Sequence, residues 1–339
     1  MVAILNPSRP LVSRLAIAIP LLLLLLAVVM LGALTVGAQS ISLKEILSDP
    51  TAHTLFFRLR LPRVLMGALI GASLALVGAA LQALFRNPLA DPFILGVSGG
   101  GAVGASLAIA FGIGAVVVGI PFIFIAAFVG AACSVFLVYG VAKTGRTLLP
   151  GALLLSGVAV NLIAAAGVLI IQFFVDPSRA HQILRWTTGS LDVVGFTTIM
   201  QMSCILIPSW IALLAMSHQL HLLAIDKETA TTLGVDVRRS EILIHLLCSL
   251  MIGVTVAVGG AVGFVGLIVP HGIRMLFGED LRIVLPGSLL LGAAFLVGAD
   301  TVARTALSST ELPVGAITAL LGGPAFLWLL RRRQRYSAL

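Results

Sequence analysis

Long apolar runs dominate this chain, and their spacing predicts its elements. A run of about 18 or more apolar residues is long enough to cross a bilayer as a helix. Breaks rich in proline, glycine or charge separate ten runs of about this length. They cover residues 15–37, 63–85, 96–113, 119–141, 151–174, 195–216, 241–258, 263–277, 286–303 and 314–330. The pattern predicts an all-α membrane protein with about ten transmembrane helices, as a single domain over residues 1–339.

The overall composition agrees with this prediction and excludes a soluble domain. Hydrophobic residues make up 59% of the chain and charged residues only 10%, and the mean hydropathy is +1.15. The three cysteines, Cys133, Cys204 and Cys248, lie far apart in apolar runs. Their spacing matches no metal site, so we predict no metal ligands.

The basic residues predict how the chain is oriented in the membrane. Ten spans place both termini on one side, and cytoplasmic loops carry the excess of lysine and arginine. With both termini cytoplasmic, 14 of the 21 basic residues fall inside. The seven that fall outside are Lys44, Arg58, Arg60, Arg63, Arg179, Arg185 and Arg304. Topology does not account for these seven, so they are candidates for a function on the outer face.

A weak internal repeat relates the two halves of the chain at an offset of 182 residues. It aligns Gly71 with Gly253 and Pro88 with Pro270, among other small residues. The offset carries the second span onto the seventh, five crossings later, so the copies point in opposite directions. The pattern therefore predicts an inverted repeat of spans 2–5 and 7–10, an arrangement common in transporters.

The chain lacks the residues of a catalytic or nucleotide-binding site. No nucleophile–base pair or paired carboxylates are recognised, and none of the three lysines follows a glycine as a phosphate loop requires. We therefore predict that the chain is not an enzyme and binds no cofactor. Ionisable groups in mid-span, which ion-coupled pumps use, are also scarce. Asp300 and Arg304 lie four residues apart near a span end, where they can pair with each other.

One compact charged segment, residues 217–240, interrupts the apolar pattern on the predicted cytoplasmic side. Asp226 is a candidate N-cap, Lys227–Leu233 a two-turn helix, and Gly234 its C′ residue. Asp236 is a candidate cap for the helix that follows. Two interpretations are open: a rigid, capped helix that receives force from a partner, or a solvated loop that only connects two spans.

The motifs along most of the chain resemble one family. They are RLRLPR at 58–63, ALFRNPLADPFILGVSGGGAVGA at 83–105, LLLSGVAVN at 153–161, RWTTGSL at 185–191, ETATTLGV at 228–235, GAVGFVGLIVPH at 260–271, ADTVAR at 299–304 and ELPVGAITALLGGPAFLWLL at 311–330. Together they resemble the FecCD-type permease subunits of ABC importers for iron–siderophores, haem and cobalamin. The family usually has glycine at the position of Asp226, and isoleucine or leucine at that of Gly272.

The resemblance implies a function and a set of partners. It implies a homodimeric permease with a central translocation path in the cytoplasmic (inner) membrane of a bacterium or archaeon. Two cytoplasmic ATPase subunits would bind ATP and Mg²⁺, and an external binding protein, periplasmic or lipid-anchored, would deliver the cargo. A ferric siderophore is the default cargo, with haem or cobalamin as alternatives. Two other classes are an ion-coupled secondary transporter and a non-transporting anchor subunit.

The resemblance also implies roles for particular residues. The residues expected to contact the ATPase are Asp226, Lys227, Glu228, Thr229, Leu233 and Gly234. The residues expected to dock the binding protein are Arg60, Arg63 and Arg304. The residues expected along the path are Leu155, Asn161, Gln172 and Arg185, with the tenth span nearby.

Simpler roles are open for the same side chains. Asn161 is equally suited to a hydrogen bond between helices. Arg304 is within reach of Asp300, and Arg60 and Arg63 can anchor their span at the headgroups. Arg185 at the outer mouth can extend to the membrane interface rather than meet cargo.

Overall fold

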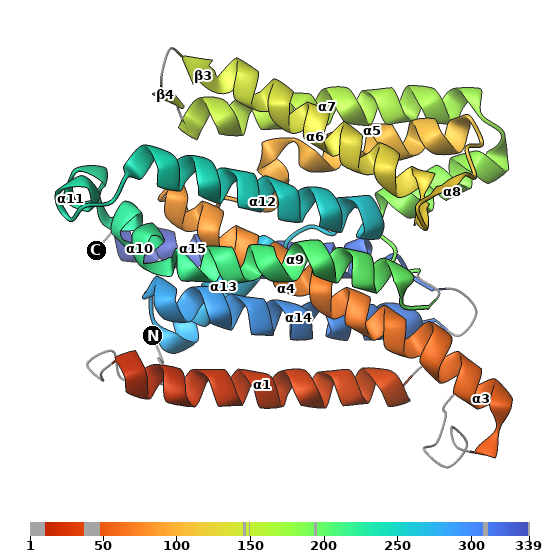
Figure 1. Cartoon of the computed structure of the whole chain (residues 1–339), viewed down its shortest axis with the longest axis horizontal. Coiled ribbons are helices and arrows are strands. Elements are labelled where there is room, and N and C mark those ends of the chain that lie inside the picture. The colour runs from red at the N-terminus through yellow and green to blue at the C-terminus, as the bar shows by residue number, and fades with distance from the viewer. Residues whose placement is uncertain are drawn as a thin grey trace.

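The computed structural model describes residues 11–36, 48–144, 147–148, 150–192, 195–307 and 311–337, and this part is almost entirely helical (Figure 1). Each of the ten predicted spans coincides with a helix. They are α1 (Leu11–Thr35), α4 (Leu61–Leu84), α5 (Val97–Ala110), α6 (Phe122–Ala142), α7 (Pro150–Phe174), α9 (Thr197–Ala215), α12 (Val237–Gly259), α13 (Val265–Phe277), α14 (Leu281–Thr305) and α15 (Val314–Ser337). The prediction of an all-α membrane protein is confirmed.

The ten helices differ in how far they can reach across a bilayer. Seven spans of the described chain are long and apolar enough to cross a membrane, and three shorter apolar helices cover 97–110, 265–277 and 314–327. The longest span, Pro50–Leu84, joins α3 (Pro50–Leu55), a π-helical turn η1 (Phe56–Arg60) and α4 without a break.

Several short elements were not predicted from the apolar pattern. They are α3, η1, a 3-10 turn η2 (Pro92–Leu95), α8 (Pro177–Thr187), α10 (Ser217–Ile225) and two antiparallel hairpins, β1 (Val116–Val117) with β2 (Ile120–Pro121) and β3 (Lys143–Thr144) with β4 (Thr147–Leu148). The helix α11 (Lys227–Thr232) was predicted. The missed elements are polar or shorter than a span, so hydropathy alone does not reveal them.

Helix α4 forms the centre of the bundle and is buried along most of its length. It packs against α14, α13, α12 and α9. Gly71 meets Gly292 of α14, and Gly78 lies so close to Gly266 of α13 that an added Cβ would stand 1.9 Å from the Gly266 carbonyl oxygen. These small residues let the helices approach backbone to backbone, as membrane helices commonly do.

The helix lengths support the predicted inverted repeat. The helices α4, α5, α6 and α7 have 24, 14, 21 and 25 residues, and α12 to α15 have 23, 13, 25 and 24. In both halves a stretch without α-helix precedes the short second helix, with positive φ at Arg86 and Gly96 in one and at Gly260 and Phe264 in the other. Figure 1 shows α4 running away from α3 while α12 runs the opposite way.

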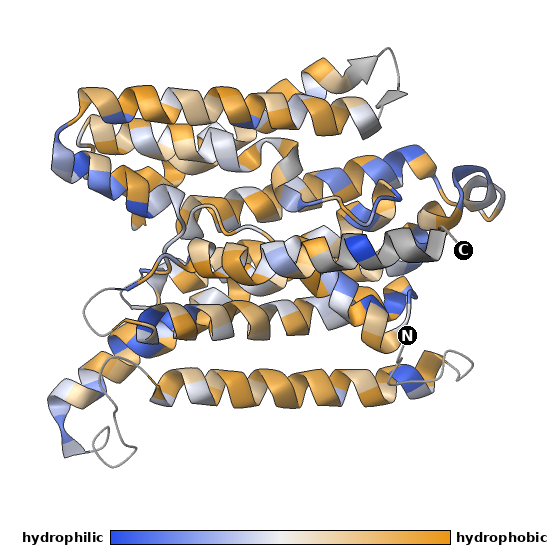
Figure 2. Ribbon diagram, turned by 180° about the vertical axis from the view of Figure 1, so that it is seen from behind, coloured by the Kyte–Doolittle hydropathy of each residue, from blue (hydrophilic) through white to orange (hydrophobic). Residues whose placement is uncertain are grey.

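The polar parts of the molecule gather at its two ends. The start of α1, the helices α10 and α11, and the end of α15 lie at one end, whereas α3 and α8 lie at the other (Figure 1). Figure 2 shows hydrophilic residues concentrated at these ends and hydrophobic residues along the helices between them. This placement fits the predicted topology, in which the 217–240 segment shares a side with both chain ends.

Candidate functional site

At the end that holds the start of α1 and the end of α15, which the predicted topology places in the cytoplasm and which is called the inner end below, the charged segment folds as a short helix with a cap at each end. Asp226 ends α10 in an extended conformation, and its carboxylate accepts hydrogen bonds from the Thr229 backbone N–H (2.9 Å) and hydroxyl (3.3 Å). The Thr229 N–H stabilises the charged carboxylate and so lowers the pKa of Asp226. The predicted N-cap is confirmed, and aspartate here supports the helix where the family usually has glycine.

The other end of α11 closes in a Schellman turn around Gly234. Gly234 has a φ of +84°, and its N–H donates to the Thr231 carbonyl (3.0 Å). The Val235 N–H donates to the Ala230 carbonyl (3.0 Å). The predicted C′ role of Gly234 is confirmed, although the helix ends at Thr232, one residue earlier than expected. Asp236 then caps α12 by accepting from the Arg239 N–H, also as predicted.

A salt bridge ties α11 to the membrane helix that follows it. The Lys227 ammonium lies 2.5 Å from the Glu241 carboxylate of α12. One turn further along α12, buried His245 packs its ring against Phe85 at the end of α4 and Tyr139 of α6. Of the predicted contact residues, Asp226 is half-buried, and the exposed ones are Lys227, Glu228, Thr229, Leu233 and Gly234. The segment therefore presents exposed side chains at the inner end while its helix α11 is tied to α12, which itself packs against α4 and α6.

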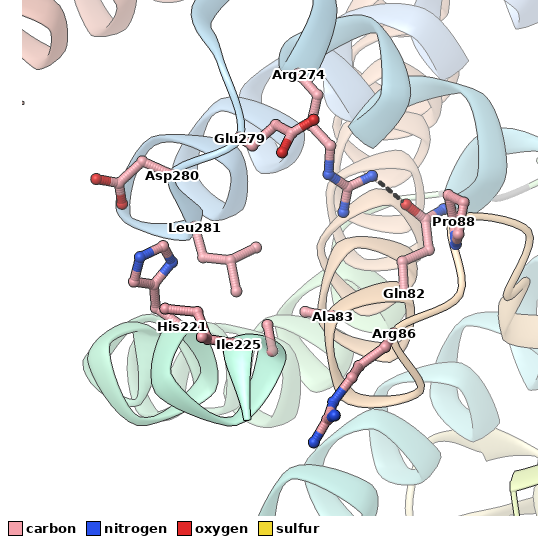
Figure 3. Close-up of a pocket in the computed structure, with 11 residues that line it drawn as sticks. Gln82, Ala83, Arg86, Pro88, His221, Ile225, Arg274, Glu279, Asp280 and Leu281 are labelled. Atoms are coloured by element: carbon pink, nitrogen blue, oxygen red, sulfur yellow. Dashed lines mark hydrogen bonds between the residues drawn. The ribbon is translucent and has the colours of Figure 1, made fainter. Parts of the chain in front are cut away.

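Beside α10 lies a polar cavity of about 410 Å³ (Figure 3). Its wall includes Gln82 from α4 and Arg274 from α13, whose guanidinium donates to the Gln82 side-chain oxygen. The Gln82 amide in turn donates to the Gly266 and Leu267 carbonyls at 3.0 and 3.3 Å. The partners of Gln82 lie about half the chain away in the sequence and were not predicted.

At the opposite end, which the predicted topology places outside and which is called the outer end below, two of the three predicted docking arginines, Arg63 and Arg304, meet in an ion-pair cluster around Asp300. Arg63 donates to both oxygens of Asp300, with its Nη2 at 2.9 Å and its Nε at 3.1 and 3.2 Å. Its Nη1 lies 2.8 Å from Glu311 and 3.6 Å from Asp192. The Nε of Arg304 lies 3.0 Å from Asp300, as an ion pair whose N–H does not point at the oxygen.

This cluster supports the simpler role that the sequence left open for Arg304. Asp300 is 2% exposed and Arg304 only 7%, and the Arg304 Nη2 also reaches the Ala33 carbonyl. The Arg63 side chain is 15% exposed, and Arg60 donates to the Leu34 carbonyl at 3.3 Å. The structure confirms pairing of Arg304 with Asp300. The docking role of the three arginines stays a prediction.

Of the residues predicted along the path, Asn161 and Arg185 have partners within the chain, whereas Leu155 and Gln172 differ in how far they are exposed. Asn161 of α7 donates to the Phe93 carbonyl (2.9 Å) and accepts from the Gly99 N–H (3.0 Å), so the predicted alternative of an interhelical bond is confirmed. Leu155 on the same helix is 74% exposed, and Gln172 is half-buried. Arg185 of α8 pairs with Asp192. Helix α7 packs on α5 and α6, whereas α15 packs on α13 and α14.

Comparison with known proteins identifies the family. The model of the FecCD transport family matches residues 23–332, which is most of the chain. The chain belongs to the FecCD transport family. The members of this family are membrane permease subunits of ABC transporters, so this FecCD chain is a multi-pass transmembrane permease and not itself an enzyme.

Relatives of this FecCD chain are known from bacteria and archaea. It is 39% identical over 322 residues to the hemin transport system permease protein HmuU of Yersinia pestis, covering 93% of this chain and 96% of that one. It is 45% identical over 288 residues to the cobalamin import system permease protein BtuC of Halobacterium salinarum, covering 84% and 75%.

A solved structure shares the fold of this FecCD chain. It is described as an inward-facing conformation of a metal-chelate type ABC transporter. The TM-score is 0.82 at 32% sequence identity, and the match covers 93% of this chain and 98% of that chain.

Proposed function

We propose that this chain is the permease of a binding-protein-dependent ABC importer that carries an iron chelate into the cytoplasm. A ferric siderophore is the first candidate cargo, and haem and cobalamin are the alternatives because similar permeases carry those names. The observation that carries the proposal is α11, a two-turn helix capped at both ends and exposed at the inner end of the molecule.

The proposed mechanism separates the energy source from the path. ATP and Mg²⁺ bind to two cytoplasmic ATPase subunits, and two copies of this chain surround a central path. The ATPase binds α11 and the residue that follows it through exposed side chains, including Glu228 and Leu233. Because Lys227 is bound to Glu241 of α12, a displacement of α11 is passed to a membrane helix rather than absorbed by a loop.

The outer arginine positions serve, in this proposal, to receive the external binding protein. Arg60 and the partly exposed Arg63 lie at the outer end of the long span, where carboxylates on two lobes of a partner can reach two copies of the same site. Arginine suits this contact because its planar fork binds a carboxylate through two parallel hydrogen bonds. Asp192 and Glu311 already lie against Arg63 and are half-exposed, so an incoming carboxylate competes with them.

The test is uptake by the reconstituted system. Proteoliposomes that contain the permease with its ATPase, supplied with the binding protein, are offered a ferric siderophore, haem or cobalamin in parallel. We expect uptake of one cargo that requires ATP hydrolysis and persists when ion gradients are collapsed. Uptake driven by a proton or sodium gradient without the ATPase would show a secondary transporter instead. Accumulation of haem or cobalamin but not of the siderophore would replace the first candidate cargo.

A further inference from the structure

The polar cavity at the inner end is built from four separate elements. Residues of α4, α10, α13 and α14, with the loop after α4 and the turn between α13 and α14, line a volume of about 410 Å³ (Figure 3). Its lining residues are Gln82, Ala83, Arg86, Pro88, His221, Ala224, Ile225, Arg274, Glu279, Asp280 and Leu281. Ile225 is the last residue of α10 and directly precedes the N-cap of α11, so the cavity adjoins the segment proposed to meet the ATPase.

Two arginines of this cavity have no carboxylate in direct contact among the residues that the structure describes. Within the described residues, no carboxylate oxygen lies within 4.0 Å of Arg274 or Arg86. Arg274 is half-buried, and the hydrogen bond that it makes here is to the neutral Gln82 amide. A guanidinium has five N–H donors, so within the described part of the chain most of the donors of Arg274 are available for a ligand.

The carboxylates near the cavity are differently placed. Asp280 is held by Arg282, which donates its backbone N–H and Nε to one oxygen and its Nη2 to the other. The Arg282 side chain thereby lowers the pKa of Asp280 and keeps it ionised and engaged. Glu279 is exposed at the rim and attracts Arg274 only from beyond ion-pair distance. The half-buried guanidinium of Arg274 is therefore the group in the cavity that can bind an anionic ligand.

We propose that this cavity receives an acidic side chain of the partner ATPase, which Arg274 binds directly while Arg86 attracts it at the rim. The inference rests on the proposed function, because it requires an ATPase at this face. Arg86 also acts electrostatically on Asp226, the N-cap of α11, so the rim and the coupling helix are neighbours. A protein that covers α11 also covers the mouth of the cavity.

A contact at Arg274, in addition to the one at α11, would let the ATPase hold the permease at two places. A single short helix held in a groove can pivot, whereas two contacts on different elements fix both position and orientation. Arg274 is joined through Gln82 to the carbonyls of Gly266 and Leu267. A pull on Arg274 is therefore transmitted to the junction of α4 and α13, and a pull on α11 is transmitted to α12 through Glu241.

The experiment measures binding of the purified ATPase to the detergent-solubilised permease at low and high salt. Arg274→Gln removes the cation, and Ala224→Phe fills the cavity without changing charge. Arg331→Gln is the matched control, because Arg331 is an exposed arginine near the end of α15, outside the cavity and outside residues 217–240. We expect the two cavity variants to bind the ATPase about 10- to 100-fold more weakly, and the control to bind within about threefold.

The outcomes separate this inference from the proposed function. If both cavity variants bind like the control while Gly234→Pro loses binding, the inference is overturned and the coupling role of α11 stands. If the ATPase does not bind the unaltered permease, the proposed function fails and this inference fails with it. Rescue of Arg274→Glu by an acid-to-arginine change on the ATPase supports the pair directly. A last arm tests a free anion as the ligand. If inorganic phosphate or anionic lipid vesicles protect the unaltered permease from thermal unfolding, and Arg274→Gln binds the ATPase as tightly as the unaltered permease, the cavity binds a free anion and the inference is overturned.

Discussion

Replacing Asp300 by asparagine tests whether the outer arginines hold the fold or only await a partner. Asp300 is 2% exposed and neutralises two guanidinium groups, Arg63 and Arg304, at distances of 2.9 and 3.0 Å. Asparagine keeps the shape of the side chain but removes the charge and turns N–H donors toward the arginines. Breaking a buried ion pair from one side typically costs about 3–5 kcal/mol, because a charge is left uncompensated.

The structure places the expected loss at the lower end of that range. Arg63 retains Glu311 at 2.8 Å, and Arg304 retains a hydrogen bond to the Ala33 carbonyl at 3.3 Å. We therefore expect Asp300→Asn to lower the free energy of unfolding by about 3 kcal/mol. For a chain of this size, that corresponds to a fall of roughly 4 °C in the midpoint of thermal unfolding. The assay is thermal unfolding of the detergent-solubilised permease, without any partner.

A matched control is available on the same arginine. Glu311→Gln removes the charge of the half-exposed carboxylate that pairs with Arg63. This variant should change the free energy of unfolding by less than about 1 kcal/mol, because exposed pairs contribute little. The double variant Asp300→Asn with Arg304→Met should recover part of the loss, since it also removes one uncompensated charge. An Asp300→Asn protein that unfolds at the temperature of the unaltered permease, yet binds the external protein more weakly, would refute the structural role and favour docking alone.

Three further predictions follow from the inner segment and the fifth span. Reversing Lys227 or Glu241 alone should lower ATP-driven uptake, and exchanging the two charges together should restore most of it, because their salt bridge joins α11 to α12; uptake that is equally low in the exchanged protein would argue against this link. Gly234→Ala should cost about 1–2 kcal/mol of local stability at its positive φ, and Gly234→Pro should leave ATP hydrolysis running without uptake, as measured by the ratio of cargo moved to phosphate released. With cysteine at 155 or 161, a polar thiol reagent should label position 155 faster if α7 borders an aqueous path, since the Asn161 site is occupied by interhelical contacts; no reaction at 155 in any nucleotide state would place that face of α7 against lipid.

The sequence predicts the helices and their local caps because both depend on residues that are near neighbours in the chain. Run lengths locate all ten apolar helices, and Asp226, Gly234 and Asp236 mark the caps of the inner segment. The inner cavity and the outer cluster are different. Arg63 and Asp300 lie 237 residues apart, and Gln82 and Gly266 lie 184 apart.

Such distant partners are hard to infer here for a physical reason. Membrane helices that are apolar on every side show no amphipathic stripe to indicate which face meets which neighbour. Close packing through glycine and alanine is nearly as uninformative, because small residues occur throughout the chain. Asn161 illustrates the limit: its side chain was an evident candidate for an interhelical bond, but nothing in the sequence identified the Phe93 carbonyl as its partner.

The glycine contacts of α4 also restrict how the protein moves. Gly71 against Gly292 and Gly78 against Gly266 leave no room for a Cβ at either crossing. Moving α4 along its neighbours by one residue, a rise of about 1.5 Å with a turn of about 100°, would carry a side chain of an adjacent position onto backbone atoms. These adjacent residues are Ile70, Ala72, Val77 and Ala79. The axial position of α4 relative to α13 and α14 is thus fixed by these contacts. When the permease opens and closes, α4, α13 and α14 should therefore move together as one rigid group. The hinges would lie outside these three helices.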